Sequence, residues 1–158
     1  MTQEIYEARD VTYTGISRRH ITDADAGNYM IIDGLLEGHL LFGDWSGPNN
    51  DYIDVFIVHD HITPFDGLAG AIPGPLSHAG FNSGVWTDKS GFTDSAGNPR
   101  LDVDYLGMLI GHEVGHYLGL SHVGLASNLM LPNSGTNDTD LTYEQYRSIT
   151  DYGWVVVV

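Results

Sequence analysis

The chain has 158 residues, of which 42% are hydrophobic and 17% are charged, as is usual for a soluble globular protein. Its 21 acidic residues outnumber six basic ones, which gives a net charge of −15. Such a surface repels phosphate backbones and anionic lipids, so we expect neither nucleic acid nor a membrane as a partner. The absence of cysteine excludes disulfides, thiolate metal sites and cysteine nucleophiles.

The N-terminal third predicts a strand, a helix and a second strand. Residues 4–16 are rich in β-branched and aromatic side chains, which favours a strand. Residues 22–42 have apolar side chains at helical spacing and begin with Thr22 or Asp23 as the N-cap, so they predict an amphipathic helix. The nearly continuous apolar run at residues 52–58 is typical of a strand in the middle of a sheet.

The middle third, residues 59–100, is rich in turn-forming residues. Two short apolar stretches within it, residues 67–72 and 84–86, predict edge strands. Two prolines, Pro73 and Pro75, follow the first stretch, and proline is tolerated better at an edge than at a sheet centre.

Two helices are expected in the last third. The first covers residues 103–119, with Asp102 or Asp104 as its cap and Gly119 at its end, where glycine readily adopts the left-handed conformation. The second starts at Thr142, with Gln145 in the position of a capping box. The order of strands and helices indicates one α+β domain over residues 1–158.

Three histidines lie in the stretch GHEVGHYLGLSH, residues 111–122. His112 and His116 are four positions apart on the expected helix, so both side chains project from one face. Gly119 lets the chain leave the helix and turn back, so that His122 can supply a third ligand. Three imidazoles with an open fourth position form a catalytic zinc site rather than a structural one.

Glu113 lies at the edge of the same helical face, where we expect it to act as general base. Zinc would lower the pKa of a water molecule, and Glu113 would take its proton and return it to the leaving amine. The alternative, a surface helix with polar histidines, does not explain why the helix is otherwise apolar. Buried histidines without partners would be costly.

HEVGHYLGLSH matches HExxHxxGxxH and thereby resembles the metzincin zinc endopeptidases, with matrixin-like or pappalysin-like catalytic domains the nearest in character. The segment SNLMLP resembles their methionine-containing turn, which implies that Met130 packs under the metal. The resemblance further implies a twisted mixed β-sheet with an edge strand that binds substrate, an active-site helix and a C-terminal helix. An upper part would span about 1–119 and a lower part about 120–158.

In this family an extended peptide adds to the edge strand, a role that falls here on residues 67–72. The loop 131–140 would form part of the pocket for the residue after the scissile bond. The substrate-binding residues so implied are Gly70, Ala71, Ile72, Leu131 and Pro132. Pro132 occupies the position of a zinc-approaching tyrosine in astacins and serralysins, and Val123 matches no subfamily pattern, so the subfamily is unassigned.

Two further segments are candidates for binding a cation. The residues His59, His61, Asp66 and His78 resemble part of the matrixin segment that binds a structural zinc and calcium. No histidine lies between His78 and His112 to complete that set, so exposed loop histidines are the alternative. Residues 88–104 offer oxygen ligands for calcium without the spacing of an EF-hand, which leaves a solvated acidic loop as the other interpretation.

We therefore predict a zinc-dependent endopeptidase that hydrolyses extended peptide or protein substrates, acts as a monomer and is secreted. Secretion is inferred from family habit and acidity, since the first ten residues lack the features of a signal peptide. The alternatives are a zinc amidohydrolase of small substrates, a catalytically inactive metzincin-like peptide-binding module and a structural zinc domain. Peptide deformylase is excluded because its third ligand is a cysteine.

Overall fold

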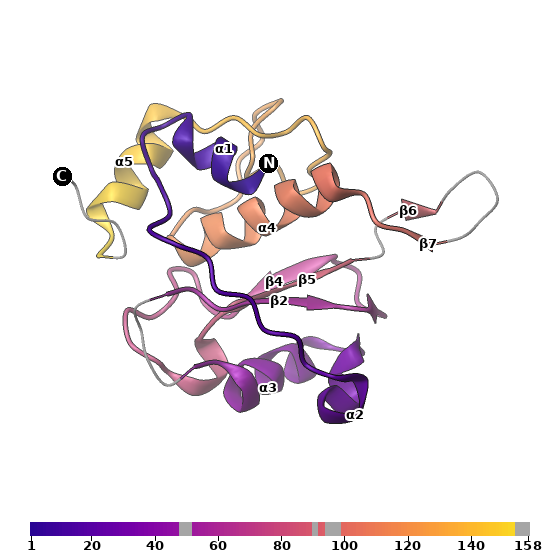
Figure 1. The fold of residues 1–158 in the computed structure, drawn as a ribbon. Coiled ribbons are helices and arrows are strands. Elements are labelled where there is room, and N and C mark those ends of the chain that lie inside the picture. Colours follow the sequence, from indigo (N-terminus) through magenta and orange to yellow (C-terminus); the bar gives the residue numbers. More distant parts are fainter. Residues whose placement is uncertain (48–51, 90–91, 94–98, 154–158) are drawn as a thin grey trace.

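The computed structural model describes residues 1–47, 52–89, 92–93 and 99–153. A small mixed sheet lies between two helical layers, which agrees with an α+β fold (Figure 1). On one face lie α1 (Thr2–Glu7), α4 (Val103–Tyr117) and α5 (Tyr143–Asp151), and on the other lie α2 (Asp23–Ala26) and α3 (Leu35–Trp45).

Among the described residues, the main sheet has the order β2 (Val55–Val58), β5 (Val85–Asp88) and β4 (Gly67–Ala69). β5 runs parallel to β2 and antiparallel to β4, and all four of its side chains are buried. Two smaller sheets pair β1 (Ile31–Ile32) with β3 (Asp60–His61), and β6 (Phe92–Thr93) with β7 (Pro99–Arg100). Short 3₁₀ helices cover Gly27–Met30 and Gly80–Asn82.

Two hydrophobic cores lie on opposite faces of this sheet. Because successive side chains of a strand point to opposite faces, Val85 packs into the core beneath α4 and Trp86 into the core beside α3. The first core also contains Tyr6 of α1, Met130 and Ile149 of α5. The histidine-bearing helix is therefore held from the sheet side, from α1 and from the C-terminal part of the chain.

The predicted strand over residues 4–16 is wrong, because residues 2–7 form the helix α1. The buried side chains in α1 are the adjacent Ile5 and Tyr6, which do not have the alternation that a half-buried strand requires. Burial of this face against α4 favours a helix over a strand. The Tyr6 hydroxyl donates to the Gly111 carbonyl at 2.8 Å, and the Thr2 hydroxyl donates to the Gly107 carbonyl.

The predicted helix over residues 22–42 is broken into several elements. Thr22 is the N-cap, as expected, and its side chain accepts from the Asp25 N–H at 3.3 Å. However, α2 ends at Ala26, where Gly27 follows with φ of +56°. Residues 31–32 then pair with β3 instead of continuing a helix, and Ile32 is completely buried there. Long-range pairing thus overrides the helical spacing of the apolar residues.

The positions of two strands in the sheet also differ from expectation. Within the described part of the chain, β2 is an edge strand rather than a central one, and Val55 and Ile57 are 39% and 51% exposed. β5, expected at an edge, is the central strand. The edge position of β4 is confirmed, although the strand ends at Ala69 rather than at residue 72.

Both late helices are confirmed. Asp102 caps α4 by accepting from the N–H groups of Asp104 and Tyr105 at 3.0 Å. Thr142 and Gln145 form the expected capping box of α5. Across the described ranges, no helix has the length and apolar character needed to span a membrane.

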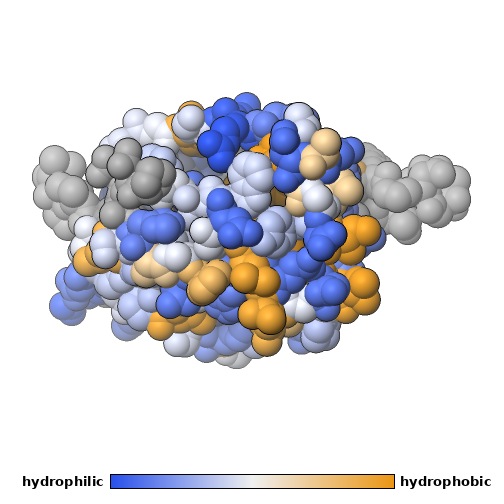
Figure 2. Space-filling model, turned by 90° about the horizontal axis from the view of Figure 1, so that it is seen from below, coloured by the Kyte–Doolittle hydropathy of each residue, from blue (hydrophilic) through white to orange (hydrophobic). Residues whose placement is uncertain are grey.

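The outer face on the α3 side mixes hydrophilic residues with several groups of hydrophobic ones (Figure 2). Leu35 and Leu36 of α3 contribute exposed apolar surface there. A shallow depression of about 380 Å³ is lined by Asn28, Tyr29, Asp33, Leu36, Glu37 and Leu40. This depression and the histidine-bearing helix lie on opposite faces of the sheet (Figure 1).

Candidate metal centre

The helix α4 carries three of the predicted site residues on buried positions. His112, Glu113 and His116 are each 6% exposed. The two histidines are one helical turn apart, and their ring centroids are 4.8 Å from each other. The predicted common face is therefore present, and it points into the molecule rather than into solvent.

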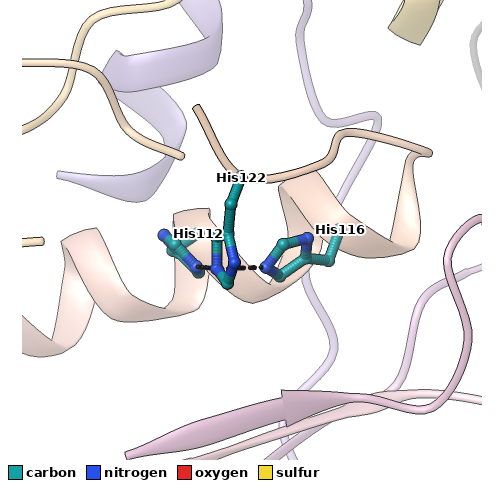
Figure 3. Close-up of side chains that lie close together, drawn as sticks. All are labelled: His112, His116 and His122. Carbon is teal, nitrogen blue, oxygen red and sulfur yellow. Dashed lines mark hydrogen bonds between the residues drawn. The ribbon is translucent and has the colours of Figure 1, made fainter. Parts of the chain in front are cut away.

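A glycine turn at the end of α4 brings in the third histidine. Gly119 has φ of +96°, and its N–H donates to the His116 carbonyl at 2.9 Å, while the Leu120 N–H donates to the Gly115 carbonyl at 2.9 Å. These two bonds form a Schellman motif, which closes a helix and reverses the chain. The chain then passes back over α4 and places His122 opposite the other two histidines (Figure 3).

The three rings converge through their Nε2 atoms. His122 Nε2 lies 3.1 Å from His112 Nε2 and 3.0 Å from His116 Nε2 (Figure 3). One ligand atom from each histidine lies within 4.8 Å of the others. Nitrogens bound tetrahedrally at 2.0–2.1 Å would be roughly 3.3 Å apart, so this spacing is close to that of a metal site.

Hydrogen bonds on the other ring nitrogens fix the tautomers. His112 Nδ1 is 2.6 Å from the Leu129 carbonyl, and His116 Nδ1 is 2.7 Å from the Leu120 carbonyl. A carbonyl only accepts, so each Nδ1 carries the proton and each Nε2 keeps a lone pair. A single proton on His122 Nε2 can satisfy only one of these lone pairs. A metal ion would satisfy all three nitrogens, and this donor set fits one.

The electrostatic environment keeps the two helical histidines neutral. Burial lowers the pKa of His116 to about 4, against the opposing effect of the hydrogen bond to Leu120. Burial also lowers the pKa of His112. The neutral imidazole is the form that binds metals, so both rings are in the ligand-competent state at neutral pH.

Glu113 lies against the edge strand β4. Burial raises the pKa of its carboxyl group to about 8, and a hydrogen bond from the Ala69 backbone opposes this shift. A Cβ atom on Gly67 would lie 2.8 Å from both Cγ and Oε1 of Glu113, so only glycine leaves room for this side chain. A cation nearby would favour the carboxylate form.

Met130 is completely buried under the helical turn between the two histidines. Its Sδ atom lies 2.6 Å from the position that a Cβ on Gly115 would occupy. The Met130 carbonyl accepts from the Val123 N–H at 2.9 Å, next to His122. The role of this segment as a methionine turn stays a prediction.

The remaining predicted site residues lie in two separate segments, residues 70–72 after β4 and residues 131–132 after Met130. The Gly70 N–H donates to the carbonyl of Gly84, the residue before β5, at 2.9 Å. Ala71 and Ile72 lie beyond the end of β4. Leu131 is half-buried and Pro132 exposed, directly after Met130. Their predicted contact with a substrate stays a prediction.

The structure does not bring His59, His61, Asp66 and His78 together as one zinc site. His59 pairs with Asp23 at 3.9 Å, and His78 lies near Asp54. Of these four residues, only His61 and Asp66 form an ion pair, in which His61 Nε2 lies 3.3 Å from Asp66 Oδ1. Within the described residues, the one group that could hold a metal ion is His112, His116 and His122. Much of the segment considered for calcium, residues 90–91 and 94–98, lies outside the described residues.

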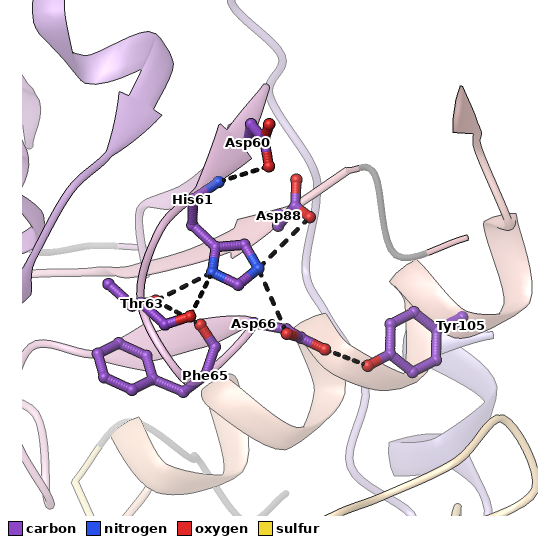
Figure 4. Close-up of polar contacts among 7 residues, drawn as sticks. All are labelled: Asp60, His61, Thr63, Phe65, Asp66, Asp88 and Tyr105. Atoms are coloured by element: carbon purple, nitrogen blue, oxygen red, sulfur yellow. Dashed lines mark hydrogen bonds and ion pairs between the residues drawn. The ribbon is translucent and has the colours of Figure 1, made fainter. Parts of the chain in front are cut away.

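His61 instead belongs to a polar network between the sheet and α4 (Figure 4). Its Nε2 faces Asp66 and the buried Asp88 at 3.3 and 3.7 Å, and its Nδ1 is 3.0 Å from the Thr63 carbonyl. The Tyr105 hydroxyl of α4 donates to Asp66 at 2.6 Å. The network ties the start of β4 to the first turn of α4. Sequence reasoning missed it because no local motif joins these distant positions.

Comparison of the chain with protein-family models and with curated proteins gives no match. The metzincin resemblance therefore remains a prediction that depends on the histidine motif and the methionine turn.

Proposed function

We propose that the protein is a zinc-dependent endopeptidase of the metzincin type. The observation that carries the proposal is the convergence of three imidazole Nε2 atoms, two of them with fixed lone pairs, around the helix that also carries Glu113. Three neutral nitrogen ligands suit zinc, which accepts tetrahedral geometry and leaves a position for substrate.

A zinc ion held by these nitrogens would supply Lewis acidity toward a carbonyl group and toward water. Glu113 would take a proton from the attacking water and pass it to the leaving amine. The hydrogen bond from Ala69 holds the Glu113 carboxyl group in place for both transfers.

The free edge of β4 supports an extended peptide as the substrate. Asp66 and Gly70 use backbone groups to pair with β5, through bonds at 2.9 Å to the Asp88 N–H and the Gly84 carbonyl. In an antiparallel ladder alternate residues pair with the neighbouring strand, so Leu68 also faces β5, while Gly67 and Ala69 turn their backbone groups to the other side. Gly67 and Ala69 therefore face outward along the edge. The Ala69 backbone donates to Glu113 there, and the carbonyl groups of Gly67 and Ala69 would pair with a peptide strand.

The test is proteolysis by the purified chain, measured on casein and on a quenched peptide library. Wild-type protein should cleave, 1,10-phenanthroline should stop cleavage, and added zinc should restore it. Glu113→Gln should bind zinc as the wild type does and lose at least roughly 100-fold in rate, because proton transfer by a positioned base contributes that much.

A wild-type chain that binds one zinc and cleaves none of these substrates would refute the endopeptidase proposal. It would favour the inactive peptide-binding module instead. Cleavage that survives in Glu113→Gln would show that another group, or a contaminant, does the chemistry.

A further inference from the structure

A three-residue segment, 128–130, contacts the ligand His112 and the residue that follows the ligand His122. The Leu129 carbonyl accepts from His112 Nδ1 at 2.6 Å. The Met130 carbonyl accepts from the N–H of Val123, the residue after His122, at 2.9 Å. A displacement of this segment would therefore disturb both His112 and His122.

The side chain of Asn128 fixes the conformation of that segment. Its Oδ1 accepts from the Met130 N–H at 3.0 Å, and the Asn128 carbonyl accepts from the Leu131 N–H at 3.1 Å. Asn128 is 2% exposed, so water does not compete for these bonds. Asparagine often closes a turn in this way, by bonding to the backbone two residues on.

Asn128 is in turn held by Gln145 of α5. Asn128 Nδ2 donates to Gln145 Oε1 at 2.9 Å, and Gln145 Nε2 donates to Asn128 Oδ1 at 3.0 Å. Gln145 Oε1 also accepts from the Thr142 N–H at 2.8 Å. Each amide oxygen thus accepts two bonds, which makes only one orientation of each amide favourable.

We propose that Asn128 and Gln145 are positioning residues of the metal centre, through which α5 sets the orientation of His112 and His122. This inference rests on the metal site proposed above. Neither side chain donates to a ligand ring itself. Both act through the backbone of residues 129 and 130, and hydrogen-bond partners of this kind commonly tune metal affinity.

The test is zinc affinity, measured by competition with a chromophoric chelator, together with the visible absorption spectrum of the Co²⁺-loaded protein. Gln145→Met removes the amide pair while keeping a side chain of similar length. It should weaken zinc binding by roughly 10- to 100-fold and change the Co²⁺ bands, because the ligand geometry relaxes.

Thr142→Ala is the matched control. It removes the hydroxyl that accepts from the Gln145 N–H at 3.2 Å, and so weakens the helix cap, but it leaves the amide pair intact. It should lower the melting temperature and keep the zinc affinity and the Co²⁺ spectrum of the wild type. This separates a positioning role from a loss of helix stability.

Gln145→Glu is the second variant. It keeps the oxygen that accepts from Asn128 and Thr142, and it puts a carboxylate oxygen in place of the donor to Asn128 Oδ1. The charge at this buried position then repels that oxygen, so zinc binding should also weaken. Wild-type affinity and an unchanged Co²⁺ spectrum in both Gln145 variants would overturn the inference, as would an equal loss in Thr142→Ala. A wild type that holds no zinc would overturn the metal site itself, whereas zinc binding without proteolysis would affect only the endopeptidase proposal.

Discussion

Gly67 leaves the space that Glu113 occupies beside β4. A Cβ atom at Gly67 would lie 2.8 Å from two atoms of the Glu113 side chain, shorter than any ordinary contact. The carboxyl group also receives the hydrogen bond from Ala69, two residues along the same strand. β4 thus holds the proposed base as well as forming the edge proposed for the substrate.

Gly67→Ala should therefore reduce peptide hydrolysis while zinc affinity stays that of the wild type. The methyl group displaces the Glu113 carboxyl group, and a shift of about 1 Å in a catalytic group can cost roughly 100-fold in rate. The measurement is steady-state cleavage of a quenched peptide together with zinc competition. Gly15→Ala, where nothing lies within 4 Å of the added atom, should leave both unchanged. An unaltered rate in Gly67→Ala would argue against Glu113 as the base.

Side chains of the site could be predicted from the sequence, but their backbone partners could not. The spacing of His112, His116 and Glu113 follows from local helical geometry, which a short motif records. The carbonyls of Leu120 and Leu129 that orient the rings belong to the backbone, and the residue type at those positions does not reveal them.

Among the secondary-structure elements, the C-terminal end of α4 determines the positions of two of the three histidines. The Schellman turn at Gly119 places the Leu120 carbonyl on His116 Nδ1 and directs the chain toward His122. One turn thus orients one ligand and delivers another.

Gly119→Ala should destabilise this turn, because φ of +96° is strained for a residue with a Cβ. The expected cost is about 1–2 kcal/mol of unfolding free energy, with weaker zinc binding as the Leu120 carbonyl moves. Denaturant unfolding and zinc competition would measure the two effects. Gly124→Ala, with open space around it, is the control. Equal stability and equal zinc affinity in the two variants would refute the assigned role of the turn.

The elements that could be predicted are those with their own start and stop signals. α4 and α5 carry caps at Asp102 and Thr142 and are confirmed. The helix α1 and the pair β1–β3 depend on burial and pairing with distant segments, which composition does not encode. The strand order also depends on pairing between distant segments, and the apolar run of β2 does not reveal which strand will lie beside it.

At the scale of the whole molecule, the candidate site lies in the core beneath α4. α4, the methionine turn and α5 share the core on one face of the sheet, and Ala69 of β4 and Val85 of β5 also pack into it. The core beside α3 contributes none of the proposed ligands. The net charge of −15 also favours accumulation of cations around the chain.

The central claim is that His112, His116 and His122 together hold one zinc ion. The most direct test is the zinc content and zinc affinity of the wild type, His122→Ala and His39→Ala, measured after dialysis and by chelator competition. His39 lies on α3, where its ring bonds to the Phe81 carbonyl at 2.7 Å. The wild type and His39→Ala should each hold one zinc per chain with equal affinity, and His122→Ala should lose more than the roughly 100-fold that loss of an outer hydrogen-bond partner costs. No zinc in the wild type, or equal losses in the two variants, would contradict the account.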